Sequence, residues 1–175
     1  MSLAIIQSIP YGKEVIKIKN ISLAFGGVKA LTNVSFEVKK GEVFAIIGPN
    51  GAGKSSMLNV INGFYKPTSG QINFAGEDRK EMIPEFAAKS GIARTFQNIA
   101  LFKGMTTLDN IMTGRLTHMK TGLLAQSIWT GKAEREEVEN REFVEKIIDF
   151  LEIQTIRKTP VGRLPYGLQK RVELG

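Results

Sequence analysis

The chain has 175 residues, of which 42% are hydrophobic and 23% charged, and these values fit one globular domain with a buried core. No run approaches the roughly 18 apolar residues of a membrane span, and the zero cysteines exclude disulfides and thiolate metal sites. The net charge of +7 would suit an acidic partner, but the basic residues are spread along the chain, so a solvated surface explains them more simply.

The first predicted elements are two half-exposed antiparallel strands. Apolar residues alternate with polar or small ones over residues 15–25 and again over 34–38, after a Gly-Gly pair. Residues 39–42 have the composition of a turn. The continuous apolar run at 43–47 then predicts a strand that is buried on both faces.

A glycine-rich loop and several short elements follow that strand. Apolar residues at helical spacing over 57–61 predict a helix, which Asn62-Gly63 would end. Beyond it we expect a short strand at residues 72–74, a short helix over 81–90, and a short strand over 92–96 that runs into a glutamine.

A longer amphipathic helix is predicted from Ala133 to Leu151. Its charged face is mainly acidic, which favours packing on a core over lying on a membrane surface. The pattern between Thr113 and Lys132 is weak and does not place Trp129. The apolar stripe of the predicted helix comprises Val138, Val144, Ile147, Ile148 and Leu151.

The glycine-rich loop is the strongest chemical signal, because Gly48, Gly53, Lys54 and Ser55 meet the pattern Gly-x-x-x-x-Gly-Lys-Ser. Glycines let backbone N–H groups converge on phosphate oxygens, and the following helix N-terminus adds partial positive charge. We expect Lys54 to neutralise the β- and γ-phosphates of a bound nucleotide, and Ser55 to ligate Mg²⁺. A glycine-rich turn that binds nothing is the alternative, and kinases, GTPases and other ATPases share the pattern. The expected nucleotide-binding loop is Gly48, Pro49, Asn50, Gly51, Ala52, Gly53, Lys54, Ser55 and Ser56.

Two downstream segments resemble those of ABC-transporter ATPases. Residues 164–171, Leu-Pro-Tyr-Gly-Leu-Gln-Lys-Arg, resemble the signature motif, usually Leu-Ser-Gly-Gly-Gln followed by basic residues. Residues 94–98, Arg-Thr-Phe-Gln-Asn, resemble the Q-loop segment, with Gln97 as its glutamine. Together with Leu-Phe at 101–102 and Met-Thr at 105–106, they look most like the ATP-binding subunits of branched-chain amino acid importers. Small-molecule kinases have no use for the 164–171 segment.

The resemblance implies an α/β fold of the P-loop NTPase class, with an N-terminal antiparallel β subdomain, a partial parallel-sheet core and a helical subdomain. We expect one incomplete nucleotide-binding domain, with the β subdomain and P-loop core over about residues 1–95 and the Q-loop and helical subdomain over about 96–175. In the family a strand ending in Asp-Glu follows the signature helix, and neither occurs here. We therefore expect the natural protein to continue past Gly175, and this chain alone to bind nucleotide but hydrolyse it poorly or not at all.

The resemblance also assigns roles outside the loop. Phe25 would stack on adenine, the alternative being a core aromatic at a strand end. Gln97 would reach Mg²⁺ or the attacking water and report nucleotide state to membrane subunits; a solvated loop glutamine is the alternative. Tyr166 and Gly167 would face the ATP held by a second copy. Pro165 replaces the signature serine and has neither a hydroxyl nor an N–H, so one phosphate contact is lost.

The function that the resemblance implies is that of the ATP-binding subunit of an importer, cytoplasmic and peripheral on the inner face of the membrane. It would close as a dimer on two MgATP molecules and drive separate membrane subunits, for branched-chain or related amino acids, with no nucleic acid partner. One alternative is a soluble ABC-type ATPase acting on ribosomes or nucleic acid, although such proteins usually carry two ATPase halves. Another is a nucleotide-binding remnant without turnover. His118, the only histidine, is expected on a loop or the surface.

Overall fold

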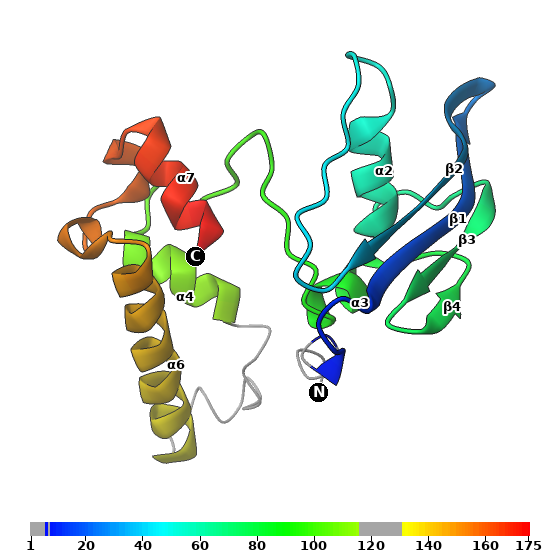
Figure 1. Ribbon diagram of the computed structural model, residues 1–175. Helices are drawn as coiled ribbons and strands as arrows, with labels where there is room; N and C mark the ends of the chain where they lie inside the picture. The colour runs from blue at the N-terminus through cyan, green and yellow to red at the C-terminus, as the bar shows by residue number, and fades with distance from the viewer. Residues whose placement is uncertain (1–5, 7, 116–130) are drawn as a thin grey trace. The chain divides into compact units, whose positions relative to one another are not determined.

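The computed structural model describes residue 6, residues 8–115 and residues 131–175, and the chain divides into two compact units (Figure 1). The first unit, Met1–Arg94, holds the strands, and the second, Thr95–Gly175, is helical. Within the described ranges, no helix combines the length and the apolarity that a membrane span requires. His118 and Trp129 lie outside the described residues.

The first unit contains a four-stranded sheet in the order β2-β1-β3-β4, and every neighbouring pair is antiparallel. Its strands are β1 (Glu14–Phe25), β2 (Val28–Lys39), β3 (Ser69–Phe74) and β4 (Glu77–Arg79). The predicted antiparallel subdomain and its first three strands are confirmed. Strand β4 was not predicted, because its three residues are all charged and show no apolar alternation.

A backbone irregularity at Asn20 keeps the apolar residues of β1 on one face. Ile16 and Ile18 occupy even positions and Ile21 and Leu23 odd ones, yet all four side chains are buried. Successive strand residues point to opposite faces, so the change from even to odd positions requires an extra residue between them. Asn20 supplies it, with a φ of 51° at a shift in the pairing of β1 with β2.

Helices α2 (Lys54–Ile61) and α3 (Pro84–Lys89) pack with the sheet into one core. Both confirm predicted helices. Asn62 caps the C-terminal end of α2, as expected, and Gly63 follows with a φ of 79°. A Cβ atom on residue 63 would lie 2.6 Å from the carbonyl carbon of Ile83. The buried core residues are Ile16, Ile18, Ile21, Leu23, Leu31, Met57, Val60, Ile72, Phe74, Met82 and Ala87.

The strand predicted at residues 43–47 is wrong. The segment is not paired in the sheet, and the described residues form no parallel ladder, so the predicted parallel-sheet core is not formed among them. Val43 is 98% exposed and Ile47 89% exposed, whereas burial on both faces was expected. A strand needs a neighbour for its N–H and C=O groups, and the apolar run alone does not supply one.

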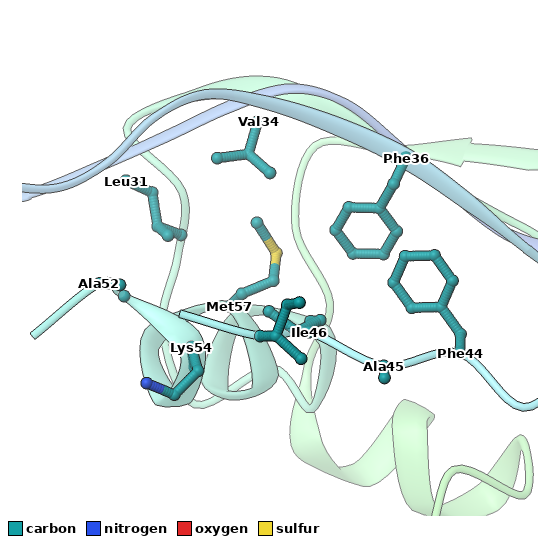
Figure 2. A pocket seen from close by; sticks show the side chains of 11 residues that line it. Leu31, Val34, Phe36, Phe44, Ala45, Ile46, Ala52, Lys54 and Met57 are labelled. Atoms are coloured by element: carbon teal, nitrogen blue, oxygen red, sulfur yellow. The ribbon is translucent and has the colours of Figure 1, made fainter. Parts of the chain in front are cut away.

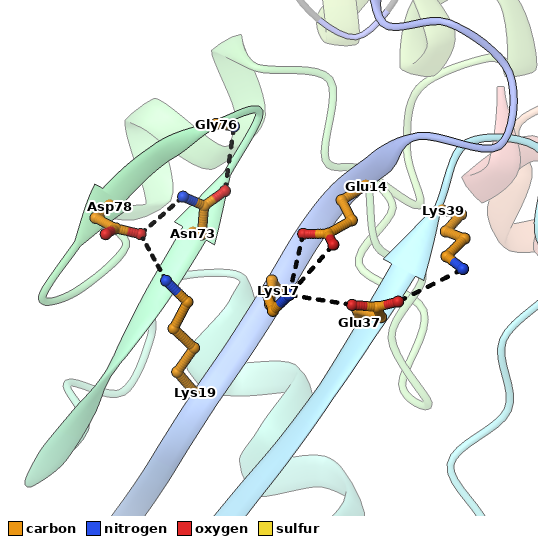
Figure 3. A network of polar contacts seen from close by, with 8 residues as sticks. All are labelled: Glu14, Lys17, Lys19, Glu37, Lys39, Asn73, Gly76 and Asp78. Carbon is orange, nitrogen blue, oxygen red and sulfur yellow. Dashed lines mark hydrogen bonds and ion pairs between the residues drawn. The ribbon is translucent and has the colours of Figure 1, made fainter.

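Charged side chains cover the outer face of the sheet (Figure 3). Lys17 Nζ lies 3.2 Å from both Glu14 and Glu37, and Lys19 Nζ lies 3.3 Å from Asp78. The hydrogen bond to Glu14 is the main cause that raises the pKa of Lys17, and the hydrogen bond from Lys17 lowers the pKa of Glu37. All these side chains reach solvent, so salt screens their attraction.

Among its described residues, the second unit contains α4 (Thr107–Arg115), α6 (Gly131–Phe150) and α7 (Tyr166–Leu174), with 3-10 turns at Gln154–Ile156 and Val161–Arg163. Helix α6 confirms the predicted amphipathic helix. Helix α4 was not predicted, because polar Thr107 and Asn110 are among its buried residues and weaken the apolar pattern. The buried core comprises Leu108, Ile111, Val144, Ile148, Ile153, Val161, Leu164 and Val172.

Val138 does not belong to the buried stripe of α6, as the sequence analysis expected. Its side chain is 51% exposed, whereas Val144 and Ile148 are fully buried. Six residues separate Val138 from Val144, and at 3.6 residues per turn they lie about 120° apart around the helix. The packed face of α6 is therefore narrower than the sequence pattern suggested.

Residues 92–96 do not form the predicted strand either. Ile92 N–H donates to Ala87 O at 3.0 Å, which ties the start of the segment to the end of α3. At its other end, the N–H and C=O groups of Phe96 contact the side chains of Glu173 and Lys170. Side chains of α7 thus take the backbone groups that a neighbouring strand would have paired.

Candidate functional site

The glycine-rich loop leads into the N-terminus of α2. Gly53 is the residue before the helix, with a φ of 81°, and the first helical hydrogen bond runs from Met57 N–H to Gly53 O at 2.9 Å. The N–H groups of Lys54, Ser55 and Ser56 therefore fall in the first turn, where an α-helix offers no carbonyl partner. These three groups and the helix dipole make this end of α2 suited to an anion.

The ammonium group of Lys54 lies at the same loop. Its Nζ donates to the carbonyl oxygens of Gly48 and Pro49, both at 2.7 Å, and the side chain is half-buried. A hollow of about 250 Å³ opens beside it, and no carboxylate lines this hollow. We call this cavity the phosphate hollow. It is lined by Ala30, Asn50, Gly51, Gly53, Lys54, Ser55 and Ser56.

The donor set of the phosphate hollow fits MgATP. Backbone amides and one ammonium group match the negative oxygens of phosphates. The Ser55 side chain is exposed at the start of α2, and its hydroxyl is the kind of oxygen ligand that Mg²⁺ takes.

Position 53 requires glycine, because the backbone there approaches β2 closely. A Cβ atom on residue 53 would lie 2.5 Å from Ala30 O and 2.8 Å from Leu31 Cδ2, and its φ lies in the region that favours glycine. A Cβ atom on Gly51, whose φ is 85°, would meet nothing within 4 Å. The loop is thus packed on β2 at Gly53 and open at Gly51.

A second hollow, of about 310 Å³, lies between β2, α2 and the segment that precedes the loop (Figure 2). Figure 2 shows Leu31, Val34 and Met57 directed into it, and the rings of Phe36 and Phe44 stacked on each other, with centroids 4.9 Å apart. This hollow is larger than the phosphate hollow, but its lining is mainly apolar. It continues the core and meets the glycine-rich loop at Ala52, Gly53 and Lys54, which also line it.

Phe25 stands at the end of β1, in the same unit as the loop. Its ring is 45% exposed and meets Tyr65 edge-on, with centroids 5.0 Å apart and planes at 74°. A two-residue turn, Gly26-Gly27, connects it to β2, which carries Ala30 to the loop. Phe25 therefore presents a partly exposed flat ring, as stacking on a base requires.

The other predicted site residues lie in the second unit. Helix α7 begins at Tyr166, and Pro165 precedes it in an extended conformation, with its carbonyl accepting from Leu168 N–H at 3.0 Å. Tyr166 OH donates to the carbonyl oxygen of Gln97 at 3.3 Å, while the Gln97 side chain is exposed. Gly167 is exposed, and a Cβ atom added there would meet nothing within 4 Å beyond the backbone of its own helix. The structure thus brings Gln97 and Tyr166 together.

Two further residues of α7, which were not predicted as site residues, contact the backbone next to Gln97. Glu173 Oε1 accepts from Phe96 N–H at 3.3 Å, and Lys170 Nζ donates to Phe96 O. The available signal was spacing, because residues 166, 170 and 173 recur on one helical face. Nothing in the sequence said which backbone they would meet.

Asn110 of α4 is another missed residue. It is buried, and its side-chain amide group accepts from Phe102 N–H at 2.8 Å and donates to the carbonyls of Phe102 and Thr106 at 3.1 and 2.9 Å. These contacts hold the loop before α4, on which Phe102 and Met105 are exposed. An asparagine between the buried apolar residues of a helix was the available signal.

Comparison with known proteins places this geometry in context. The family described as "ABC transporter" matches residues 31–175. The chain is 33% identical, over 162 residues, to the high-affinity branched-chain amino acid transport ATP-binding protein BraF of Pseudomonas aeruginosa, covering 93% of this chain and 64% of BraF. It is 38% identical, over 164 residues, to the probable branched-chain amino acid transport ATP-binding protein LivG of Methanocaldococcus jannaschii, covering 93% and 62%. The chain thus spans less than two thirds of the length of these relatives.

Solved structures give the same picture. A nucleotide-free ATP-binding cassette from an ABC transporter matches with a TM-score of 0.73 and 37% identity, covering 93% of this chain and 63% of that one. The ADP conformation of such a cassette matches with a TM-score of 0.74, at the same identity and coverage. A dimeric post-hydrolysis cassette bound to ADP and phosphate matches with a TM-score of 0.66 and 25% identity, covering 91% and 67%.

Proposed function

Because this chain belongs to the ABC transporter family of ATP-binding proteins, we propose that it is the ATP-binding subunit of an importer for branched-chain or related amino acids. The single observation that carries nucleotide binding is the phosphate hollow, where the first-turn amides of α2 meet the Lys54 ammonium. The amino acid substrate is supported by the printed names of the relatives BraF and LivG.

We assign the phosphates of MgATP to the loop from Gly48 to Ser56. Lys54 would neutralise the β- and γ-phosphates, and the Ser55 hydroxyl would hold Mg²⁺. In the role that the family resemblance implies, Gln97 would reach Mg²⁺ or the attacking water. The metal, when bound, would supply charge neutralisation at the phosphate oxygens. Phe25 would stack on adenine through its exposed ring face.

We further propose that two copies close on two ATP molecules. Tyr166 and Gly167 stand at the N-terminus of α7, and backbone amides at such an end suit the phosphates of an ATP held by the second copy. The similarity to a dimeric cassette bound to ADP and phosphate supports this arrangement. The further partners would be integral membrane subunits, with this protein peripheral on the inner face of the membrane.

The chain as it stands would bind ATP without hydrolysing it efficiently. Its 175 residues contain no Asp-Glu pair, and in phosphoryl-transfer enzymes carboxylates of this kind hold the metal and orient the nucleophile. Positioning supplies most of the catalysis in such reactions, so without these groups turnover should be slow.

Calorimetric titration with MgATP tests the binding proposal, comparing the chain with Lys54→Ala. Loss of a charge-assisted contact should weaken binding at least about tenfold, by the usual cost of removing a hydrogen bond to a charged group. Lys80→Ala removes an exposed lysine of the same unit and should leave the affinity unchanged. Equal affinities for the Lys54→Ala variant and the parent chain would refute the proposed site.

A further inference from the structure

Three polar side chains follow one face of α7. Tyr166, Lys170 and Glu173 stand at positions i, i+4 and i+7, which a helix brings to the same side. Proposed phosphate binding involves only the first turn of this helix, so it leaves Lys170 and Glu173 without a role.

Lys170 and Glu173 contact each other and both backbone groups of Phe96, which lies in the Q-loop segment. Glu173 Oε1 accepts from Phe96 N–H at 3.3 Å, Lys170 Nζ donates to Phe96 O, and the two side chains form an ion pair at 2.7 Å. The Glu173 side chain is only 9% exposed and that of Lys170 29%, so solvent screens this pair less than the ion pairs of the sheet. Both backbone groups of Phe96 are held by charged partners.

Tyr166 extends the same contact to the next residue. Its hydroxyl donates to Gln97 O at 3.3 Å, and the Lys170 ammonium lies 5.9 Å from the centre of its ring. Two consecutive backbone carbonyls, of Phe96 and Gln97, therefore bond to one helix face. The Gln97 side chain, by contrast, remains exposed.

We propose that Tyr166, Lys170 and Glu173, here named the α7 clamp, are positioning residues that couple the N-terminus of α7 to the Gln97 side chain. This inference rests on the proposed function, in which that N-terminus faces the ATP of a second copy and Gln97 reaches the metal of its own. A helix moves as a rigid element, so a displacement of its first turn carries Lys170 and Glu173 with it. The backbone from which the Gln97 side chain projects must follow.

Amide hydrogen exchange without nucleotide tests the clamp itself. Glu173→Met removes the acceptor of the Phe96 N–H and should raise the exchange rate of the Phe96 amide about tenfold, the usual effect of losing a hydrogen bond to a charged group. Lys170→Met removes the ion-pair partner of Glu173 and the donor to Phe96 O, and should raise the same rate by a smaller factor. Arg171→Met removes a positive charge as Lys170→Met does, at an exposed position of the same helix, and should leave that rate unchanged. Unaltered exchange of Phe96 in both clamp variants would overturn the clamp.

The coupling is tested by the NMR signal of the Gln97 side-chain amide during MgATP titration, with dimer formation followed by light scattering. In the parent chain and in Arg171→Met, the signal should shift as dimers form. Lys170→Met and Glu173→Met should still dimerise, with at least a twofold smaller shift. An equal shift in these variants overturns the coupling. If the parent chain binds no MgATP, the proposed function fails and the coupling fails with it, while the exchange experiment still decides whether the clamp exists.

Discussion

The carbonyl oxygen of Ala30 lies where a Cβ atom of residue 53 would come within 2.5 Å of it, so β2 and the glycine-rich loop are in contact at Gly53. Gly53→Ala should therefore lower the free energy of unfolding by about 2–3 kcal/mol, combining backbone strain at positive φ with a clash against backbone. Exchange of the α2 amides in urea would measure this loss.

Gly51→Ala separates the cost of backbone strain from the cost of the clash with Ala30. Gly51 also has a positive φ, of 85°, but its substituent would enter open space. This variant should lose only about 1 kcal/mol, the cost of backbone strain alone. Equal losses at the two positions would show that the contact with Ala30 is unimportant.

Phe25→Ala should weaken MgATP binding by about five- to a hundredfold, the range expected from loss of an aromatic stacking partner. Phe25→Tyr keeps a flat ring and should bind within about twofold of the parent chain. Inorganic triphosphate lacks a base, so both variants and the parent should bind it equally in the same calorimetric titration. A parallel loss of triphosphate affinity in Phe25→Ala would indicate damage to the loop and not a lost stacking contact.

Asn110→Ala should destabilise the second unit by about 1–3 kcal/mol. The substitution leaves the part-buried N–H group of Phe102 without its partner, and an unsatisfied group of this kind costs about 1–3 kcal/mol. The measurement is the exchange of the α4 and α6 amides in urea. Asn98→Ala, an exposed asparagine of the same unit, should change the free energy of unfolding by less than about 0.5 kcal/mol. A similar effect for both variants would contradict the buried role of Asn110.

Acid should weaken the sheet through its outer charges (Figure 3). The hydrogen bond from Lys17 lowers the pKa of Glu37, and those from Asn73 and then Lys19 lower the pKa of Asp78. Because the folded pKa values are depressed, the stabilisation is complete above the ordinary carboxyl range, near about pH 4, and is lost as the pH falls through the lower folded values.

Urea unfolding midpoints at about pH 5 and about pH 3 would measure this loss. Glu37→Gln should reduce the difference between the two midpoints, and added salt should reduce it in the parent chain. Glu142→Gln removes an exposed carboxylate of the other unit and serves as the control. If the difference between the two midpoints is the same in Glu37→Gln as in the parent chain, the Lys17–Glu37 contact is not a cause of the acid sensitivity.

Features governed by local chain chemistry were predictable from the sequence. The helix that follows the glycine-rich loop and the alternation in β1 each depend on residues within a few positions. The resemblance to ABC-transporter ATPases was confirmed by the family match over residues 31–175. It could be seen in the sequence because its motifs are short and keep their order. The roles of Phe25, Gln97 and Tyr166 remain predictions.

Features governed by distant partners were not predictable. The run at residues 43–47 is apolar enough for a strand, but pairing depends on a neighbour that sequence alone does not reveal. Phe96 looked like a strand residue, yet its amide bonds to Glu173, 77 positions away. Asn110 is polar and still buried, because its partners belong to a loop whose path the sequence pattern does not show.

The carbonyl oxygens of Gly48 and Pro49 compete with any incoming anion for the ammonium group of Lys54. A ligand must draw the ammonium group away from Gly48 O and Pro49 O, so its affinity is the difference between the new contacts and the two that are given up. A singly charged anion replaces those contacts with little gain. A polyphosphate, which engages the amides of α2 at the same time, gains more than it displaces, so the loop discriminates by ligand charge before any base or metal is recognised.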